Sequence, residues 1–134
     1  NVRDWLHVRD HASAVETVLK TARAGAVYNI GGNNEWQNID IVNLICDLLD
    51  GRLGRPAGDN RQLITFVKDR PGHDRRYAID ASRLKAELGW EPAHTFEQGI
   101  AETIDWYLAN QEWVCQVTSG AYREYYAEQY GERQ

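Results

Sequence analysis

The stretch VRDWLHVRDHASAVETVLKTARAGAVYNI, residues 2–30, decides the fold class because its hydrophobic period changes twice along its length. Residues 2–8 have the short aromatic and β-branched pattern of a strand, and residues 26–30 show a similar pattern. Between these two runs, apolar side chains recur with helical spacing at Val15, Val18, Leu19 and Ala22. A strand, a helix and a second strand in succession predict an α/β fold.

Residues with special backbone preferences mark where the first two helices should begin and end. Asp10 is the expected N-cap of the first helix, and Gly25 is the left-handed residue expected to end it. The second helix is expected to open at Asn38 or Asp40 and to stop at Gly51. Its apolar face is formed by Ile41, Leu44, Ile45, Leu48 and Leu49.

Two more strand-like runs follow in the second half of the chain, at residues 62–67 and 76–79. Asp80 is then expected to cap a short helix over residues 81–88, which Gly89 ends. Because strands alternate with helices, the chain is predicted to be a mixed α/β protein. The strands are too few and too scattered for a complete doubly wound Rossmann sheet.

The sequence TFEQ, residues 95–98, has the spacing of a capping box, in which Thr95 and Gln98 bond each other's backbone N–H groups. It predicts the start of the longest helix, whose inner side carries Phe96, Ile100, Ile104, Tyr107 and Leu108. The tail that follows is aromatic and charged without a clear period.

The composition bounds the class of protein. The chain has 134 residues, of which 43% are hydrophobic, so one domain with a real core is expected. Its net charge of −5 provides no general basic face for nucleic acid. No apolar run approaches the roughly 20 residues of a membrane span, and no signal peptide leads the chain. The two distant cysteines fit a reduced, cytoplasmic protein.

Familiar catalytic and metal-binding motifs are missing from the sequence. There is no Gly-x-Gly-x-x-Gly, no phosphate-loop motif, no Gly-x-Ser-x-Gly elbow and no Tyr-x-x-x-Lys pair. The adjacent glycines of NIGGNN, residues 29–34, suit a tight turn better than a phosphate loop. His7 and His11 lie across a predicted strand-to-helix break, so no zinc site is expected there.

What remains is a set of residues that can bind an anion, centred on DRPGHDRRYAID, residues 69–80. Pro71 fixes its backbone angle and Gly72 permits a sharp bend, so the turn is rigid. Such a turn can hold Arg70 and His73 steady, and a planar guanidinium pairs two phosphate oxygens at once.

Two residues elsewhere extend this set. Arg3 lies in a strand-like run, and Asn38 lies at an expected helix N-terminus, where backbone N–H groups favour anions. Plainer explanations stay open at this point. Arg70 can pair with Asp69 or Asp74 on the surface, and Asn38 can be only a helix cap.

Four stretches, taken in order along the chain, resemble a known family. They are RDWLHVRDHASAV, YNIGGNNEWQNIDIV, LITFVKDRPGHDRRYAIDASRLKAELGWEP and TFEQGIAETIDWYLAN. Together they look very much like the C-terminal part of dTDP-glucose 4,6-dehydratases. These are extended short-chain dehydrogenase/reductase enzymes that act on nucleotide sugars. The loop DRPGHDRRYAID is the most specific part of the resemblance.

The resemblance implies a parent enzyme that removes water from dTDP-glucose to give dTDP-4-keto-6-deoxyglucose. A tightly held NAD⁺ takes a hydride from sugar C4, water leaves across C5 and C6, and the hydride returns to C6. In the family, the groups for this chemistry lie in the N-terminal portion. Residues 1–134 are therefore expected to be a C-terminal substrate-binding portion without the NAD-binding domain, and inactive alone. The lack of any Met and the start within a strand-like run agree with a fragment.

Carried over by motif, the substrate contacts of the family fall on five residues, and none of the five is catalytic, cofactor-binding or metal-binding. The resemblance assigns Arg3 and Arg70 to the pyrophosphate, with Asn38 helping from its helix end. His73 is expected near the nucleoside. Tyr130, in EQYGERQ, is the choice for a family tyrosine that contacts substrate from the C-terminal tail.

The resemblance also predicts which surface lacks a partner. In the family, the AVYNI strand and the helix after HV-x-D pack onto the cofactor domain. Apolar surface on these elements is therefore expected to be exposed, or to be covered by another copy of the chain. The parent enzyme is expected to be a homodimer that is held mainly through the cofactor domain, so the same dimer is not assumed for this chain.

Two other interpretations fit parts of the sequence. The first keeps the fold and changes the reaction, to a fragment of a UDP- or GDP-sugar epimerase or decarboxylase. The second is a non-catalytic interaction domain, in which the charged loop is only a solvated face. A preference for thymidine nucleotides over uridine and guanosine nucleotides separates the first from the dehydratase.

Overall fold

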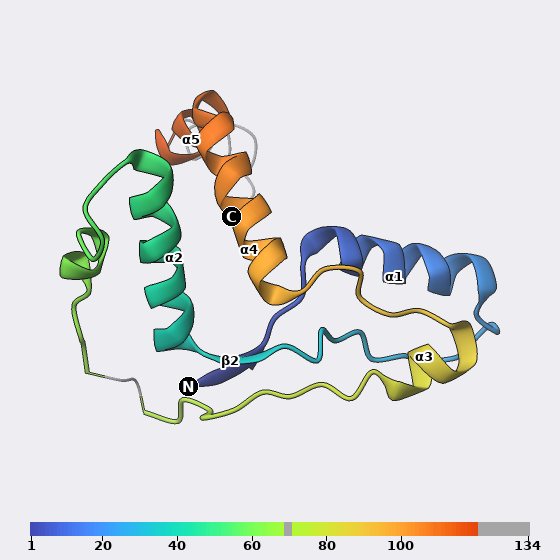
Figure 1. Cartoon of the computed structure of the whole chain (residues 1–134). Helices are drawn as coiled ribbons and strands as arrows, with labels where there is room; N and C mark the ends of the chain where they lie inside the picture. Colours follow the sequence, from blue (N-terminus) through green and yellow to red (C-terminus); the bar gives the residue numbers. More distant parts are fainter. Residues whose placement is uncertain (69–70, 121–134) are drawn as a thin grey trace, which may run out of the picture. The chain divides into compact units, whose positions relative to one another are not determined.

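The computed structural model describes residues 1–68 and 71–120, and the chain divides into two compact units, residues 1–101 and 102–134. The first unit contains, in order, β1 (Val2–Asp4), α1 (Val8–Thr21), β2 (Glu35–Gln37), α2 (Asn38–Leu53), the 3₁₀ helix η1 (Asn60–Leu63) and α3 (Ser82–Leu88) (Figure 1). The next helix, α4 (Phe96–Ala109), crosses the boundary, and α5 (Gln111–Thr118) lies in the second unit. The mixed α/β class is confirmed.

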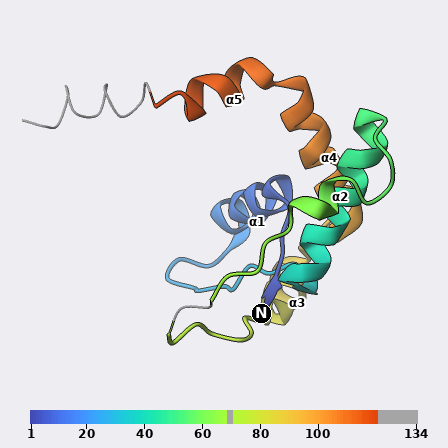
Figure 2. The ribbon, with the colours of Figure 1, turned by 90° about the vertical axis from the view of Figure 1, so that its left-hand side faces the viewer.

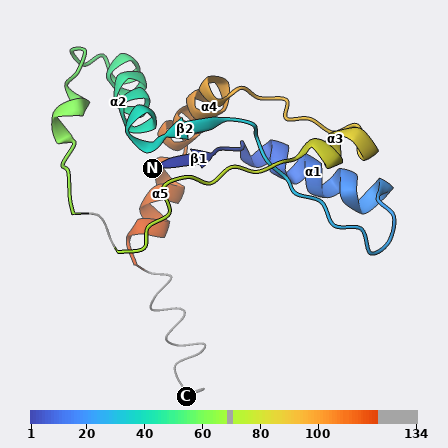
Figure 3. The ribbon, with the colours of Figure 1, turned by 90° about the horizontal axis from the view of Figure 1, so that it is seen from below.

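The strand β1 lies at the centre of a small sheet. It pairs antiparallel with β2, so that Arg3 stands opposite Trp36. On its other edge, Val2 forms an isolated parallel bridge to Arg76, and the Tyr77 N–H donates to the Val2 carbonyl at 3.0 Å. Figure 3 shows β1 between β2 and this later segment. Residues that are far apart in the sequence therefore meet at β1.

Two adjacent glycines let the chain cross closely over the end of β1. A Cβ on Gly32 would lie 2.1 Å from the Trp5 carbonyl oxygen, and one on Gly31 would lie 2.7 Å from an Asp4 carboxylate oxygen. That carboxylate accepts the N–H groups of Gly32 at 2.9 Å and of Asn34 at 2.8 Å. The NIGGNN stretch is therefore a junction closed by the chain's own backbone.

The four predicted strands are not formed as expected in the described part of the chain. Two are shorter than predicted, and two are absent. Only Val2–Asp4 pairs within residues 2–8, and residues 76–79 contribute one bridge. Residues 26–30 and 62–67 form no strand; Figure 2 shows the trace after η1 as an irregular loop. A strand needs a neighbour to bond its backbone, and the apolar pattern alone does not supply one.

The start of α1 differs from the prediction. The helix begins at Val8, so Asp10 is not its N-cap and lies inside the first turn, only 3% exposed. The Asp10 carboxylate accepts the backbone N–H of His94 at 3.1 Å and lies 2.9 Å from His94 Nδ1. It therefore ties α1 to the segment before α4. At the other end, Gly25 (φ 81°) lies in the turn beyond the C-cap Ala22 and does not itself end the helix.

This buried carboxylate makes stability depend on pH in the acid range. Burial raises the pKa of Asp10, but hydrogen bonds from the side chain and backbone of His94 lower it by more, so the pKa lies below its ordinary value. A carboxyl with a lowered folded-state pKa stabilises the fold above its unfolded pKa of about 3.9. That stabilisation is lost as the pH falls through the folded-state pKa.

We therefore expect the urea midpoint to fall steeply below about pH 4, and Asp10→Asn to remove part of this dependence. The difference between the two proteins at each pH separates Asp10 from the exposed carboxyl groups. If the urea midpoint falls by the same amount at low pH in both proteins, Asp10 does not cause this pH dependence.

The helix α2 begins as predicted and ends later than predicted. Asn38 is its first helical residue, Gln37 is the N-cap, and the Asn38 N–H donates to the Asn1 carbonyl at 2.9 Å. Gly51 lies within the helix, whereas Gly54 (φ 64°) is the left-handed C-cap. The prediction for Gly51 was wrong because a glycine ends a helix only where the backbone turns to positive φ.

The predicted start signal of α4 and the predicted end of α3 are confirmed, whereas α3 begins at Ser82 with Ala81 as its N-cap, so Asp80 lies one residue before the cap. Asp80 Oδ1 accepts the Ser82 N–H at 2.9 Å, and Gly89 (φ 69°) is the left-handed C-cap of α3. Before α4, Gln98 N–H donates to Thr95 Oγ1 at 3.3 Å, and Thr95 N–H donates to Gln98 Oε1 at 3.2 Å. These two bonds form the expected capping box.

The core of the first unit is small. Its buried members are Ala14, Leu84 and Trp90, and the side chains packed against them are Leu6, Val18, Tyr28, Ile30 and Leu88. The Trp90 Nε1–H donates to Ser13 Oγ at 2.9 Å, so the indole keeps a hydrogen bond inside the core. On the predicted inner side of α4, Phe96 and Ile104 are buried but Tyr107 is 47% exposed.

Large apolar side chains of α1 and of the segment after it lie on the surface. Between 48% and 85% of each remains exposed in Val8, Val15, Leu19 and Val27. This confirms the expectation that apolar surface is exposed on these elements. That a second copy of the chain covers this surface stays a prediction.

Candidate functional site

The Arg3 side chain extends from β1 and has contacts on several sides. Nη1 donates to the Val2 carbonyl at 2.7 Å, and Nη2 donates to the Asp74 carbonyl at 3.1 Å. Nη2 also lies 2.9 Å from His73 Nε2. The guanidinium carbon lies 4.3 Å from the centre of the Tyr77 ring, within the range of a cation–π contact. These contacts fix the plane and position of the guanidinium.

His73 connects Arg3 to the N-terminus of α2. The His73 Nδ1 atom lies 3.0 Å from the side-chain amide of Asn1. The Asn1 carbonyl in turn accepts the N–H of Asn38, the first residue of α2. The structure therefore joins Arg3, His73 and Asn38 through Asn1 in one hydrogen-bonded chain. Arg3 and His73 are 70 positions apart in the sequence.

The contact with Arg3 sets the role of one His73 ring nitrogen. A guanidinium has only N–H donors, so His73 Nε2 accepts this bond. The other ring nitrogen, Nδ1, faces the side-chain amide of Asn1.

A second arginine attaches the same segment to β2. Arg76 donates from Nε and Nη2 to the Glu35 carboxylate at 2.6 Å and 2.7 Å. These hydrogen bonds raise the pKa of Arg76 and lower the pKa of Glu35. Arg76 is thus neutralised by an ion pair. By contrast, the hydrogen bonds of Arg3 within the described part of the chain go to two carbonyl groups and an imidazole, and none goes to a carboxylate. Its charge is therefore available to an anion.

Two of the five predicted site residues, Arg70 and Tyr130, lie outside the described residues. Their assignments stay predictions. The plainer explanation of Asn38 as a cap is wrong, because Gln37 is the N-cap of α2. The Asp74 carboxylate, a possible partner for Arg70, accepts the Tyr77 O–H.

Sequence reasoning missed two residues of this cluster, Asn1 and Tyr77. Asn1 belongs to no motif, and its role depends on the pairing of β1 with β2, which brings it beside Asn38. Tyr77 carried one usable signal, because an aromatic residue directly follows a loop rich in arginine. Its actual partner, Arg3, comes from the other end of the first unit.

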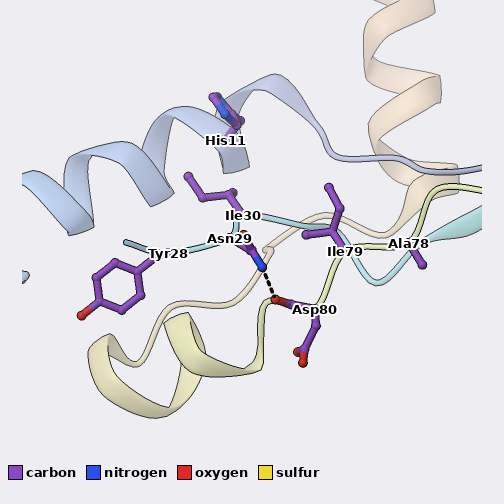
Figure 4. A pocket seen from close by; sticks show the side chains of 7 residues that line it. All are labelled: His11, Tyr28, Asn29, Ile30, Ala78, Ile79 and Asp80. Atoms are coloured by element: carbon purple, nitrogen blue, oxygen red, sulfur yellow. Dashed lines mark hydrogen bonds between the residues drawn. The ribbon is translucent and has the colours of Figure 1, made fainter. Parts of the chain in front are cut away.

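An open pocket lies between α1, the segment before Gly31 and the segment before α3. Its lining consists of His11, Tyr28, Asn29, Ile30, Ala78, Ile79 and Asp80 (Figure 4). Asn29 Nδ2 donates to the Asp80 carbonyl at 3.3 Å. None of the predicted site residues in the described part of the chain lines this pocket, so it is separate from the Arg3 cluster.

The described residues contain no cluster of three or more histidine, cysteine and carboxylate side chains that fits a metal ion. His7 precedes α1, and its ring lies against the His94 ring at a tilt of 44°, with the ring centres 4.2 Å apart. Cys46 and Cys115 are free thiols. Among the helices of residues 1–68 and 71–120, none is both long enough and apolar enough to span a membrane.

The sequence model of one protein family, described as GDP-mannose 4,6 dehydratase, matches residues 1–103. The chain belongs to this family. Among its curated relatives, a protein from Xanthomonas campestris is 63% identical over 123 residues. The match covers 91% of this chain and 35% of that protein. A protein from Escherichia coli is 55% identical over 133 residues, covering 99% of this chain and 37% of that protein. Both are named dTDP-glucose 4,6-dehydratase.

Two solved structures are similar in fold as well as in sequence. A dTDP-glucose 4,6-dehydratase from Bacillus anthracis, in complex with NAD, matches with a TM-score of 0.68 and 50% identity over 84% of this chain and 33% of its own. A double mutant of the enzyme of that name from Streptomyces venezuelae, also with NAD bound, matches with a TM-score of 0.70 and 37% identity over the same shares. The resemblance to dTDP-glucose 4,6-dehydratases is therefore confirmed, and the chain spans about a third of the length of these relatives.

Proposed function

We propose that this chain is the nucleotide-sugar-binding part of a dTDP-glucose 4,6-dehydratase, the enzyme that converts dTDP-glucose to dTDP-4-keto-6-deoxyglucose and water. Relatives of that name are 55% and 63% identical to almost the whole chain. The observation that carries the proposal is the contact of Arg3 with His73 next to the start of α2. It supports a substrate site made of the residues that the family motifs select.

The cluster has the chemistry that a diphosphate needs. Arg3 presents a positive charge that makes no hydrogen bond to a carboxylate within the described residues. A guanidinium also has N–H donors beyond those that Val2, His73 and Asp74 accept. The N-terminus of α2 adds the partial positive charge of a helix end. Arg70 is proposed as the second arginine of the site and Tyr130 as a further substrate contact.

The described residues do not fit a dinucleotide. The adjacent glycines, Gly31 and Gly32, approach Asp4 and the Trp5 carbonyl so closely that no phosphate can lie there. We therefore assign NAD, which is bound in the solved relatives, to a part of the parent enzyme outside this chain. Residues 1–134 are then its C-terminal substrate-binding portion, inactive alone, and the parent enzyme is a homodimer.

Calorimetry with dTDP, UDP and GDP tests the proposal. The unsubstituted chain is expected to prefer dTDP, and Arg3→Ala is expected to weaken binding about tenfold to a hundredfold, since it removes charged hydrogen bonds to the diphosphate. Arg83→Ala is the matched control, because Arg83 pairs with Glu87 on the surface of α3 and should leave affinity unchanged.

Each outcome of this experiment bears on a different part of the proposal. A preference for UDP or GDP would argue for the epimerase or decarboxylase alternative. Unchanged affinity in Arg3→Ala would remove Arg3 from the site, and no nucleotide binding at all would favour an interaction domain. Formation of a 4-keto sugar by the isolated chain with added NAD⁺ would contradict the claim that it is inactive alone.

A further inference from the structure

Tyr77 is joined to Arg3 by three separate routes. Its ring lies under the Arg3 guanidinium, with the guanidinium carbon 4.3 Å from the ring centre. Its O–H donates to the carboxylate of Asp74, whose backbone carbonyl accepts a hydrogen bond from Arg3 Nη2. Its N–H donates to the Val2 carbonyl, which also accepts Arg3 Nη1. One residue therefore contacts the face of the guanidinium, the Val2 carbonyl that accepts from it, and the side chain of Asp74, whose carbonyl is the other acceptor.

The Tyr77 hydroxyl also holds the carboxylate of Asp74. Asp74 is next in sequence to His73, and its carbonyl lies 3.1 Å from Arg3 Nη2. If the Asp74 carboxylate turned towards the Arg3 guanidinium, the two would form an ion pair like the one between Arg76 and Glu35. The bond from the Tyr77 O–H keeps this carboxylate occupied. The charge of Arg3 then stays available to a ligand.

We propose that Tyr77 is the positioning residue of the diphosphate site: it fixes the plane of the Arg3 guanidinium and keeps the Asp74 carboxylate away from it. The inference rests on the proposed function, because it concerns how Arg3 binds a nucleotide diphosphate. It assigns to Tyr77 a role that acts through Arg3. Fixing the side chain beforehand reduces the entropy that is lost when the diphosphate binds.

Two substitutions at Tyr77 separate the two parts of this role. Tyr77→Phe keeps the ring face and loses the O–H, so affinity for dTDP should fall about twofold to threefold as Asp74 competes for Arg3. Tyr77→Leu loses both, and affinity for dTDP should fall about tenfold. A loss of this size is expected when a cation–π contact is removed and the Arg3 side chain must be ordered on binding. Tyr77 is 49% exposed, so either variant should fold.

A ligand-free measurement tests the positioning itself. In NMR spectra, the Arg3 Nε–H signal should show the ring-current shift of a group above an aromatic face. Tyr77→Phe should keep that shift, and Tyr77→Leu should lose it. Tyr28→Leu is the matched control, because Arg83 lies over the Tyr28 ring at 5.0 Å in the same way. It should leave both the Arg3 signal and dTDP affinity unchanged.

The outcomes distinguish this inference from the proposed function. If Arg3→Ala loses dTDP binding while Tyr77→Leu keeps both the affinity and the Arg3 signal of the unsubstituted chain, the positioning role is overturned and the site stands. If Tyr77→Phe binds dTDP as the unsubstituted chain does, the part assigned to Asp74 is wrong. If the unsubstituted chain binds no dTDP, the proposed function fails and this inference fails with it.

Discussion

Replacing Gly32 with alanine is expected to lower the free energy of unfolding by at least about 4 kcal/mol. The added Cβ would lie 2.1 Å from the Trp5 carbonyl oxygen, which is backbone and cannot rotate away. The two segments cannot separate at little cost either. The Asp4 carboxylate holds the Gly32 and Asn34 N–H groups, and the Trp5 N–H donates to the Asn34 carbonyl at 3.0 Å. Because small domains have only about 5–15 kcal/mol in total, this loss removes a large share of the stability of the chain.

Urea denaturation followed by circular dichroism measures this effect, with Gly51→Ala as the control. Gly51 lies inside α2, where an added Cβ would meet nothing within 4 Å. Alanine there should stabilise the chain by about 0.5–1 kcal/mol, since glycine is the weaker helix former. A Gly32→Ala protein with the urea midpoint of the unsubstituted chain would contradict the close crossing at β1.

The second large effect is expected from Asp10→Ala, which should cost about 2–4 kcal/mol of unfolding free energy. The Asp10 side chain is almost fully buried, and its carboxylate bonds both the backbone N–H and the Nδ1 of His94. Removing it leaves these donors without their acceptor in a place that water scarcely reaches. The link between α1 and the segment before α4 is lost with them.

Two further variants show whether the buried bonds cause the loss. Asp10→Asn keeps one side-chain oxygen as an acceptor, so it should cost less than Asp10→Ala. Glu16→Ala removes a carboxylate from the same helix, but Glu16 forms an exposed pair with Lys20, and stability should change little. Equal losses in Asp10→Ala and Glu16→Ala would mean that the bonds to His94 contribute nothing.

Local signals predicted the helices well. The capping box of Thr95 and Gln98, the Asp80 bond and the Gly89 cap depend on neighbouring residues only, and all are present. Asp10 was assigned wrongly because its carboxylate bonds His94, which lies 84 positions away. A cap is one of several uses for a buried carboxylate, and the distant donor was not visible in the local pattern.

Strands were predicted poorly for a related reason. Alternating or β-branched runs show that a segment suits a strand, but the strand forms only where a neighbour bonds its backbone. Residues 62–67 show this clearly, because Phe66 and Val67 are each 84% exposed and no strand forms there. Among the residues that the structure describes, only Val2–Asp4 and Glu35–Gln37 pair as strands.

Sequence alone was enough to predict the family resemblance, the capping box before α4, the Gly89 cap of α3, and Arg3, Asn38 and His73 as candidates for one site. These depend on motifs and on neighbouring residues. The folded chain adds two contacts that the sequence did not reveal: Arg3 lies against His73 and Tyr77, and Arg76 pairs with Glu35. The reason is that β1 bonds the chain on both of its edges, which brings residues from about position 35 and position 75 to the same arginine. No local pattern specifies such a meeting, because it depends on which segments pair across the sheet.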